Sequence, residues 1–252
     1  ILYKDIIDNS SNNSTVFNAV LQNLVDQKFP VNDDMKEDAA TIIKQIKSAY
    51  KSNYGDNYKD SLNQALTSAG YKNLSEYRQR MIKQIQYANF LLDYIDDHFD
   101  DIFNDYYQQC APKYVSLIKI SVSDTSSPTD DETSKLNEVK ELISNTNKSF
   151  GDIAQDYSDD STSSKKGSLG IVDSKDTSGI ANSYGEDVFN AIEALSEGQV
   201  SDVITGDDGY YFVKVTSTDK KTLKKELKKT DIDSPLLAYD DYLQYVVYNS
   251  YK

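Results

Sequence analysis

Glycine is distributed unevenly along this 252-residue chain, and this limits the fold more than any other sequence feature. Eight of the ten glycines lie in residues 114–218, where short apolar runs alternate with turn residues. The two flanks, residues 1–113 and 219–252, instead carry apolar residues at the spacing of amphipathic helices. The chain is therefore predicted to be an α+β protein. Its two ends form one helical domain, and the glycine-rich segment 114–218 is inserted into it.

The helical flanks are predicted from apolar spacing and from the residues that end helices. In the first flank, Pro30, Gly55 and Gly70 separate successive apolar sets. One long helix is predicted from about residue 73 to residue 109. In the second flank, a basic helix is predicted from Lys220, and a second helix after Pro235 carries on one side Leu236, Tyr239, Leu243, Val246 and Val247. The second helix is predicted to pack on the first flank.

The inserted segment alternates strand and helix signals. Strands are predicted at residues 114–122, 167–172, 200–204 and 210–215, where β-branched and aromatic residues cluster. Helices are predicted between them, and a Gly-containing loop at 205–209 predicts a hairpin. This order predicts an antiparallel sheet of about four strands flanked by helices.

Composition excludes several classes of function. With 41 acidic and 27 basic residues the net charge is −14, which argues against nucleic acid as a partner. A single histidine, His98, and a single cysteine, Cys110, are too few for a structural zinc site or an internal disulfide. No metal and no cofactor is expected, and no apolar run approaches the ~18 residues of a membrane span. The start at Ile1, without Met, favours a trimmed mature form.

Four segments of the insert, in order, resemble the parvulin family of peptidyl-prolyl isomerases. They are FGDIAQDYSDD at 150–160, GSLG at 167–170, LSEGQVS at 195–201 and GYYFVKV at 209–215. The helical flank around residues 54–85 also resembles the helical domain of the PrsA-type extracellular foldases and of SurA. The resemblance implies a parvulin-like (PpiC-type rotamase) domain at 114–218 and a chaperone-like helical domain at 1–113 plus 219–252.

The resemblance departs from the family at the site. Parvulins usually place one histidine on the first strand and one on the last, and these positions hold Lys119 and Tyr211 here. Asp160 matches the family's Cys-or-Asp position. The resemblance therefore implies a degenerate catalytic set of Asp160, Lys119 and Tyr211. The implied substrate-binding residues are Val188, Phe189 and Leu169, with the register near Val188 open by a residue or more.

Structural explanations stand beside these assignments. Lys119 could be a solvated strand residue, Tyr211 a core tyrosine with a satisfied hydroxyl, and Asp160 a turn former that bonds its own backbone. His98 lies in an acidic stretch typical of a charged helix surface, and Cys110 is predicted to be a small buried hydrophobe.

Three functions are compatible with this pattern. The first is a foldase or chaperone whose isomerase domain is weak or inactive. The second is an active prolyl isomerase with a site that lacks histidine. Isomerisation crosses a barrier of ~20 kcal/mol and needs no covalent step, so desolvation and aimed dipoles can catalyse it. The third is a surface scaffold that binds one partner.

The resemblance also implies partners and a location. The expected partners are Xaa-Pro peptides and unfolded or partly folded secreted proteins, and a homodimer through the helical domain is a further expectation. Fifteen of the twenty tyrosines lie in the two flanks, where they offer contact area with a polar tip. The expected location is extracytoplasmic, on the outer face of a Gram-positive membrane, held by a lipid anchor upstream of Ile1.

Overall fold

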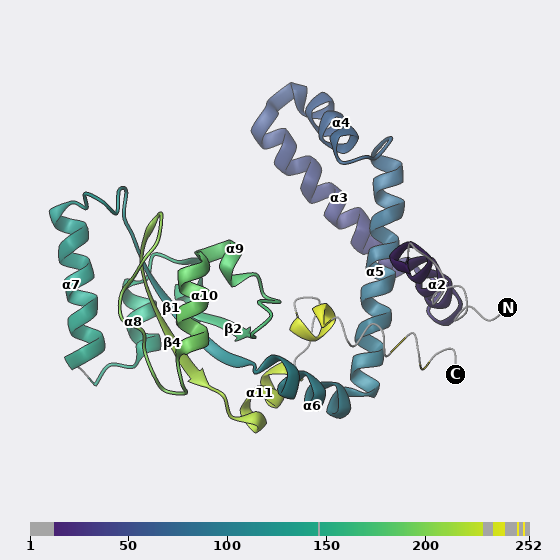
Figure 1. The fold of residues 1–252 in the computed structure, drawn as a ribbon. Helices are drawn as coiled ribbons and strands as arrows, with labels where there is room; N and C mark the ends of the chain where they lie inside the picture. Colours follow the sequence, from purple (N-terminus) through teal and green to yellow (C-terminus); the bar gives the residue numbers. More distant parts are fainter. Residues whose placement is uncertain (1–12, 146, 229–233, 240–245, 247–248, 250–252) are drawn as a thin grey trace. The chain divides into compact units, whose positions relative to one another are not determined.

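The structure, a computed structural model, describes residues 13–145, 147–228 and 234–239, together with 246 and 249 (Figure 1). Compactness divides the chain into two units, Ile1–Asp97 with Asp240–Lys252, and His98–Tyr239. The second unit is wider than the predicted insert, because it includes helices on both sides of residues 114–218. The predicted domain boundaries themselves stay a prediction.

The first unit contains α2 (Asn13–Lys28), α3 (Asp33–Tyr54), α4 (Tyr58–Ser68) and α5 (Leu74–Asp97). The Asn32 side chain caps α3 by accepting a hydrogen bond from the Met35 backbone N–H at 3.0 Å. Gly55, with φ of 54°, ends the helix. The core between α3 and α5 consists of apolar residues at helical spacing, namely Met35, Ala39, Ile43, Met81, Ile82 and Ile85.

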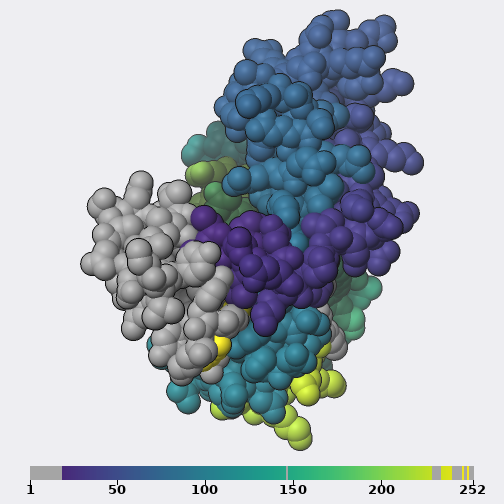
Figure 2. Space-filling view, turned by 90° about the vertical axis from the view of Figure 1, so that its right-hand side faces the viewer, coloured from purple at the N-terminus to yellow at the C-terminus, as the bar shows by residue number. Residues whose placement is uncertain are grey.

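These helices pack as neighbours along the chain. Helix α3 contacts both α4 and α5, and α2 contacts α5. Figure 2 shows α2 in purple beside the blue helices of the same unit. Lys83 on α5 pairs with Asp26 on α2 at 2.6 Å. Among the described residues, no helix is long and apolar enough to cross a membrane.

The long helix predicted to reach residue 109 is wrong, because the structure has two helices there. Helix α5 ends at Asp97, and α6 (Phe99–Cys110) begins after His98, whose φ of −123° and ψ of 21° are not helical. The two helices fall into different units. Cys110 is fully buried, which confirms its predicted place in the core.

The second unit is built on a four-stranded antiparallel sheet, as predicted, and its strands lie in the order β2-β1-β4-β3. The strands are β1 (Lys113–Ser121), β2 (Ser168–Val172), β3 (Ile204–Thr205) and β4 (Gly209–Ser217). The strand predicted at 200–204 is much shorter than expected. Val200 forms only an isolated bridge to Lys214, and pairing resumes at Ile204.

Helices cover the two faces of the sheet (Figure 1). Helices α7 (Asp130–Asn145) and α8 (Phe150–Tyr157) pack on Ile118, Ile120 and Phe212. Helices α9 (Ile180–Tyr184) and α10 (Glu186–Ala194) pack on the other face, where the core is formed by alternate strand residues such as Leu117, Tyr211 and Val213.

The chain after the sheet returns to α6. Helix α11 (Lys220–Leu227) contacts α6 through an ion pair in which the Lys224 ammonium lies 2.9 Å from the Asp100 carboxylate. After Pro235 the described residues form a 3-10 turn, η3 (Pro235–Ala238), in place of the start of the predicted α-helix. Tyr239 donates a hydrogen bond to Asp105 of α6 at 2.7 Å. Leu243 and Val247, also assigned to that predicted helix, lie outside the described residues.

Candidate functional site

The two residues at the positions of the parvulin histidines lie side by side on neighbouring strands. Lys119 on β1 is paired with Tyr211 on β4 in the antiparallel register. The Lys119 ammonium lies 5.6 Å from the centre of the Tyr211 ring. Tyr211 is only 2% exposed, whereas the Lys119 side chain keeps 18% of its surface. The structure thus brings these two predicted site residues together on the face covered by α9 and α10.

Asp208, in the hairpin loop between β3 and β4, binds both side chains. One carboxylate oxygen accepts a hydrogen bond from the Lys119 ammonium, and the other accepts one from the Tyr211 hydroxyl. Sequence reasoning missed Asp208. The only available signal was two adjacent aspartates in the predicted turn, and nothing in that pattern distinguishes Asp208 from Asp207.

The hairpin loop is shaped to fit Tyr211. The Gly206 N–H donates to the Gly209 carbonyl at 2.9 Å, which closes the loop. A Cβ atom at Gly206 would lie 2.7 Å from Cε2 of the Tyr211 ring, closer than nonbonded carbon atoms approach. The absence of a side chain at 206 therefore makes the space that the tyrosine ring occupies.

The charges of this group follow from its contacts. Hydrogen bonding from Lys119, reinforced by Tyr211, lowers the pKa of Asp208 below its ordinary value. Burial, together with the Asp208 carboxylate, raises the pKa of Tyr211 well above 10. At neutral pH the group therefore holds one ammonium, one carboxylate and one neutral hydroxyl whose proton is donated to that carboxylate.

A loop after α8 fixes the backbone on both sides of Lys119. The Lys119 N–H donates to the Ser158 hydroxyl at 3.1 Å, and the Asp159 N–H donates to the Lys119 carbonyl at 2.8 Å. The Asp159 carboxylate accepts from the Ser121 N–H at 2.9 Å and pairs with Lys135 at 2.6 Å. These bonds place the following residue, Asp160, at the edge of the site.

Asp160 has a local role as well as a place in the site. One of its carboxylate oxygens accepts from the backbone and the hydroxyl of Thr162, at 2.8 and 2.6 Å, and so caps the turn η2 (Ser161–Lys165). Burial raises the pKa of Tyr184 to about 12, and the negative charge of Asp160 contributes to this shift. The turn-forming explanation is therefore confirmed by these contacts, and the role of Asp160 in a site stays a prediction.

Tyr184, at the end of α9, is a second residue that sequence reasoning missed. Its ring meets the Tyr211 ring edge to face, with centres 6.2 Å apart. It therefore connects Asp160 to Tyr211. The short helix α9 was not predicted, so no signal in the sequence related Tyr184 to the sheet.

The three apolar residues assigned to substrate binding differ in exposure. Val188 is 1% exposed and belongs to the core with Ile192 and Val213. Leu169 and Phe189 pack against the same cluster but keep part of their surface exposed. Of the three, Leu169 and Phe189 are therefore the ones with exposed surface, and their assignment to substrate binding stays a prediction.

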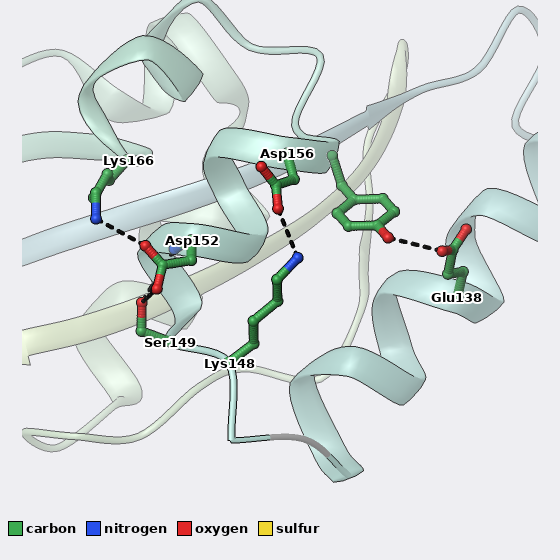
Figure 3. Close-up of polar contacts among 7 residues, drawn as sticks. Glu138, Lys148, Ser149, Asp152, Asp156 and Lys166 are labelled. Carbon is green, nitrogen blue, oxygen red and sulfur yellow. Dashed lines mark hydrogen bonds and ion pairs between the residues drawn. The ribbon is translucent and has the colours of Figure 1, made fainter.

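The outer side of α8 carries exposed polar contacts that hold this helix to its neighbours (Figure 3). Asp152 pairs with Lys166 at 2.7 Å, and Asp156 pairs with Lys148 at 2.6 Å. Tyr157 donates to Glu138 of α7 at 2.8 Å. These contacts lie around the helix that leads into the loop at 158–160. Among the described residues, no group of three His, Cys, Asp or Glu is arranged to hold a metal ion.

Comparison with known proteins relates residues 117–217, which include most of the sheet, to a protein family. Residues 117–217 match the PPIC-type PPIASE domain family, also called Rotamase. The foldase protein PrsA of Staphylococcus aureus (strain MRSA252) is 32% identical over 115 residues, 43% of this chain and 34% of the relative. PrsA of Staphylococcus epidermidis (strain ATCC 12228) is 36% identical over 110 residues, 41% and 31% of the two chains. Each match thus spans about a third of the relative's length.

Two solved structures also align with this chain. PrsA of Streptococcus pneumoniae aligns over 99% of this chain and 86% of that chain, with 20% identity and a TM-score of 0.46. PrsA of Bacillus subtilis aligns over 98% and 85%, with 22% identity and a TM-score of 0.43. The sequence matches confirm the predicted resemblance: residues 117–217 are similar to the PPIC-type PPIASE domain, and the similar proteins are named PrsA foldases.

Proposed function

We propose that this chain is an extracytoplasmic foldase of secreted proteins, in which the PPIC-type domain binds Xaa-Pro segments and isomerises them weakly. The domain match and the foldase names of the relatives support the general class. The observation that carries the finer proposal is the Asp208 contact, because the carboxylate engages Lys119 and Tyr211 together.

Weak turnover follows from where the protons of this group are directed. Catalysis of the isomerisation requires donors aimed at the amide as it twists. Tyr211 has one proton, which it donates to Asp208, so it cannot donate to a substrate while that bond is kept. Lys119 also directs one proton to the same carboxylate. The group is satisfied internally and offers a bound peptide few donors.

An active isomerase is the second candidate, and the remaining donors of Lys119 favour it. An ammonium has three protons, and only one is needed for Asp208. Lys119 could direct another toward a substrate carbonyl, with Asp160 and Tyr211 beside it, while Leu169 and Phe189 contact the proline ring. In this case Lys119 carries most of the electrostatic stabilisation.

Exchange spectroscopy on a blocked Xaa-Pro peptide separates the two candidates. The purified chain is added, and the cis–trans exchange rate is compared with that in the presence of Lys119→Gln and Asp160→Ala. Weak turnover predicts acceleration near the detection limit, while peptide resonances still shift on binding. Strong acceleration lost in Lys119→Gln establishes the active isomerase. Absence of both shifts and acceleration contradicts both candidates.

The helical unit would hold unfolded chains on exposed apolar and tyrosine surface. Ile42 and Tyr54 on α3 are large hydrophobic residues that remain exposed, and Tyr54 stacks on Tyr50 with ring centres 5.5 Å apart. Suppression of aggregation of a reduced secreted protein tests this, with Ile42→Ser/Tyr54→Ser compared against Lys44→Ser on the same helix. If the double variant and Lys44→Ser lose the same amount of aggregation suppression, binding through apolar surface is contradicted.

Location and assembly complete the proposal. We place the protein on the outer face of a Gram-positive membrane, held by a lipid anchor, and we include a homodimer through the helical domain. The alternative of a scaffold for one partner predicts saturable binding to a single folded protein and no affinity for unfolded chains. Binding of an unfolded client therefore decides against the scaffold.

A further inference from the structure

We infer that Asp208 determines the charge selectivity of this site, so that Xaa-Pro peptides with a neutral or basic Xaa bind and those with an acidic Xaa are disfavoured. The inference deepens the proposed function and rests on it. Its basis is that the Lys119 ammonium, the cation at the centre of the site, is already neutralised by Asp208.

Two further lysines of this unit belong to ion pairs of their own on the side of α7 and α8. Lys135 pairs with Asp159 at 2.6 Å, and Lys166 pairs with Asp152 at 2.7 Å. Asp160 adds a carboxylate whose bonds are to the backbone and the hydroxyl of Thr162. The carboxylates of Asp160 and Asp208 both act on Tyr211, and Lys119 supplies one ammonium beside them, so this set of three charges is anionic by one.

A charged Xaa side chain would feel this balance at short range. The Asp208 side chain is 63% exposed while that of Lys119 is 18% exposed, so the carboxylate is more accessible than the ammonium it neutralises. An acidic Xaa meets the accessible carboxylate and is repelled, whereas a basic Xaa is attracted. Residues 114–218 carry 19 acidic and 8 basic side chains, which adds a field of the same sign.

Removing only the charge of Asp208 should weaken the discrimination against an acidic Xaa. In Asp208→Asn the Lys119 ammonium loses its counter-ion, and the remaining charges of Lys119 and Asp160 sum to zero. An acidic Xaa then gains an ionic partner. Because such a pair is partly exposed, the change in relative affinity is expected to reach about fivefold and no more.

Asp207 provides a matched control. It is the neighbouring residue of the same loop and it is exposed, and the bonds to Lys119 and Tyr211 come from Asp208. Asp207→Asn makes the same change in net charge one position away. A general effect of the acidic surface would respond to both substitutions, whereas an effect of the Asp208 contact responds to one.

The test is a set of NMR titrations of the full chain with blocked Ala-Xaa-Pro-Phe peptides in which Xaa is Glu, Gln or Lys. We expect wild type to bind the Lys peptide most tightly and the Glu peptide least. Asp208→Asn should shift the Glu-to-Gln affinity ratio toward Glu by up to about fivefold, and Asp207→Asn by less than twofold. Higher ionic strength should shrink the difference.

A second readout follows Asp208 without any peptide. In protein carrying ¹³Cζ-labelled tyrosine, the Tyr211 resonance should titrate at lower pH in Asp208→Asn than in wild type, because the neighbouring carboxylate is gone. Should Asp208→Asn fail to fold, Lys119→Gln removes the cation instead and should deepen the discrimination against Glu.

The outcomes are distinct. An unchanged Glu-to-Gln ratio in folded Asp208→Asn overturns the selectivity while leaving the proposed function standing. An equal shift in Asp207→Asn also overturns it, because it assigns the effect to the general field. If no peptide binds to wild type, the proposed function fails and the inference fails with it.

Discussion

Lysines on β1 and lysines around α8 make hydrogen bonds of similar length in very different surroundings. Lys113 and Lys119 keep 12% and 18% of their side-chain surface, whereas Lys148 and Lys166 keep 40% and 62%. The Lys148 and Lys166 pairs are 2.6 and 2.7 Å long, close to 2.7 and 2.9 Å for bonds of Lys113. Distance therefore does not separate the two groups.

The exposure of the side chain distinguishes the lysines on β1 from those around α8. An ammonium removed from water must be given partners, and losing one leaves an uncompensated charge. An exposed ammonium exchanges its protein partner for water at little cost. The β1 lysines are therefore expected to matter for stability and for the site, and the α8 lysines to serve mainly as solvated surface.

The largest effect is expected for Lys113→Met. The Lys113 ammonium donates to the carbonyls of Ile192, Glu193 and Leu195, at 2.9, 2.7 and 3.1 Å, and so caps the C-terminus of α10. Its loss should lower the free energy of unfolding by about 3 kcal/mol. Urea denaturation measures this, and Lys165→Met at an exposed position is the control. Equal midpoints for the two variants would contradict the comparison.

Gly206→Ala should have the next largest effect. The added methyl would overlap the Tyr211 ring, so the ring or the loop must move, at a cost of about 1–3 kcal/mol. The ¹³Cζ resonance of Tyr211 should shift as its bond to Asp208 is disturbed. Gly198→Ala is the control, because no atom lies within 4 Å of a Cβ there, although its φ of +83° adds strain of its own. A perturbed Tyr211 resonance in the control alone would exclude the steric explanation.

A smaller effect is expected from acid. Because the pKa of Asp208 is lowered in the folded protein, its charge stabilises the fold above the unfolded value of 3.8, and this contribution disappears as pH falls through the folded pKa. The stability difference between wild type and Asp208→Asn should be at most ~1 kcal/mol at pH 7, given the exposure of the pair. It should disappear once the pH has fallen below the folded pKa. A difference that grows on acidification has the opposite sign and contradicts the ion pair.

The smallest effect is expected at α8. A double-mutant cycle with Lys148→Ala and Asp156→Ala should give no coupling above experimental error, because both groups are solvated (Figure 3). A coupling as large as the effect of Lys113→Met would show that burial does not distinguish the two groups of lysines.

Much of the sheet unit could be predicted from sequence because its signals are local. Alternating apolar residues in β1, the glycines around β2 and the hairpin signal before β4 each specify a short element. That residues 119 and 211 lie on neighbouring strands is implied by the parvulin resemblance, and the register pairs them. The local signals alone predict each strand but not which strands are neighbours in the sheet.

Asp208 and Tyr184 could not be predicted because their roles depend on tertiary geometry. Which of Asp207 and Asp208 points to Lys119 is set by the twist of a tight hairpin, and composition is the same for both. The break at His98 was missed for a related reason. Apolar spacing continues through it, from Ile95 to Phe99 and Ile102, so the pattern alone predicts one helix.

The missing side chain at Gly206 has a consequence for how this loop can vary over evolutionary time. Because the Tyr211 ring fills the space beside it, position 206 stays restricted to glycine for as long as a tyrosine stands at 211. A smaller residue at 211 would release that restriction. Variation at the two positions should therefore be linked across descendants of this chain, with the tyrosine replaced before the glycine.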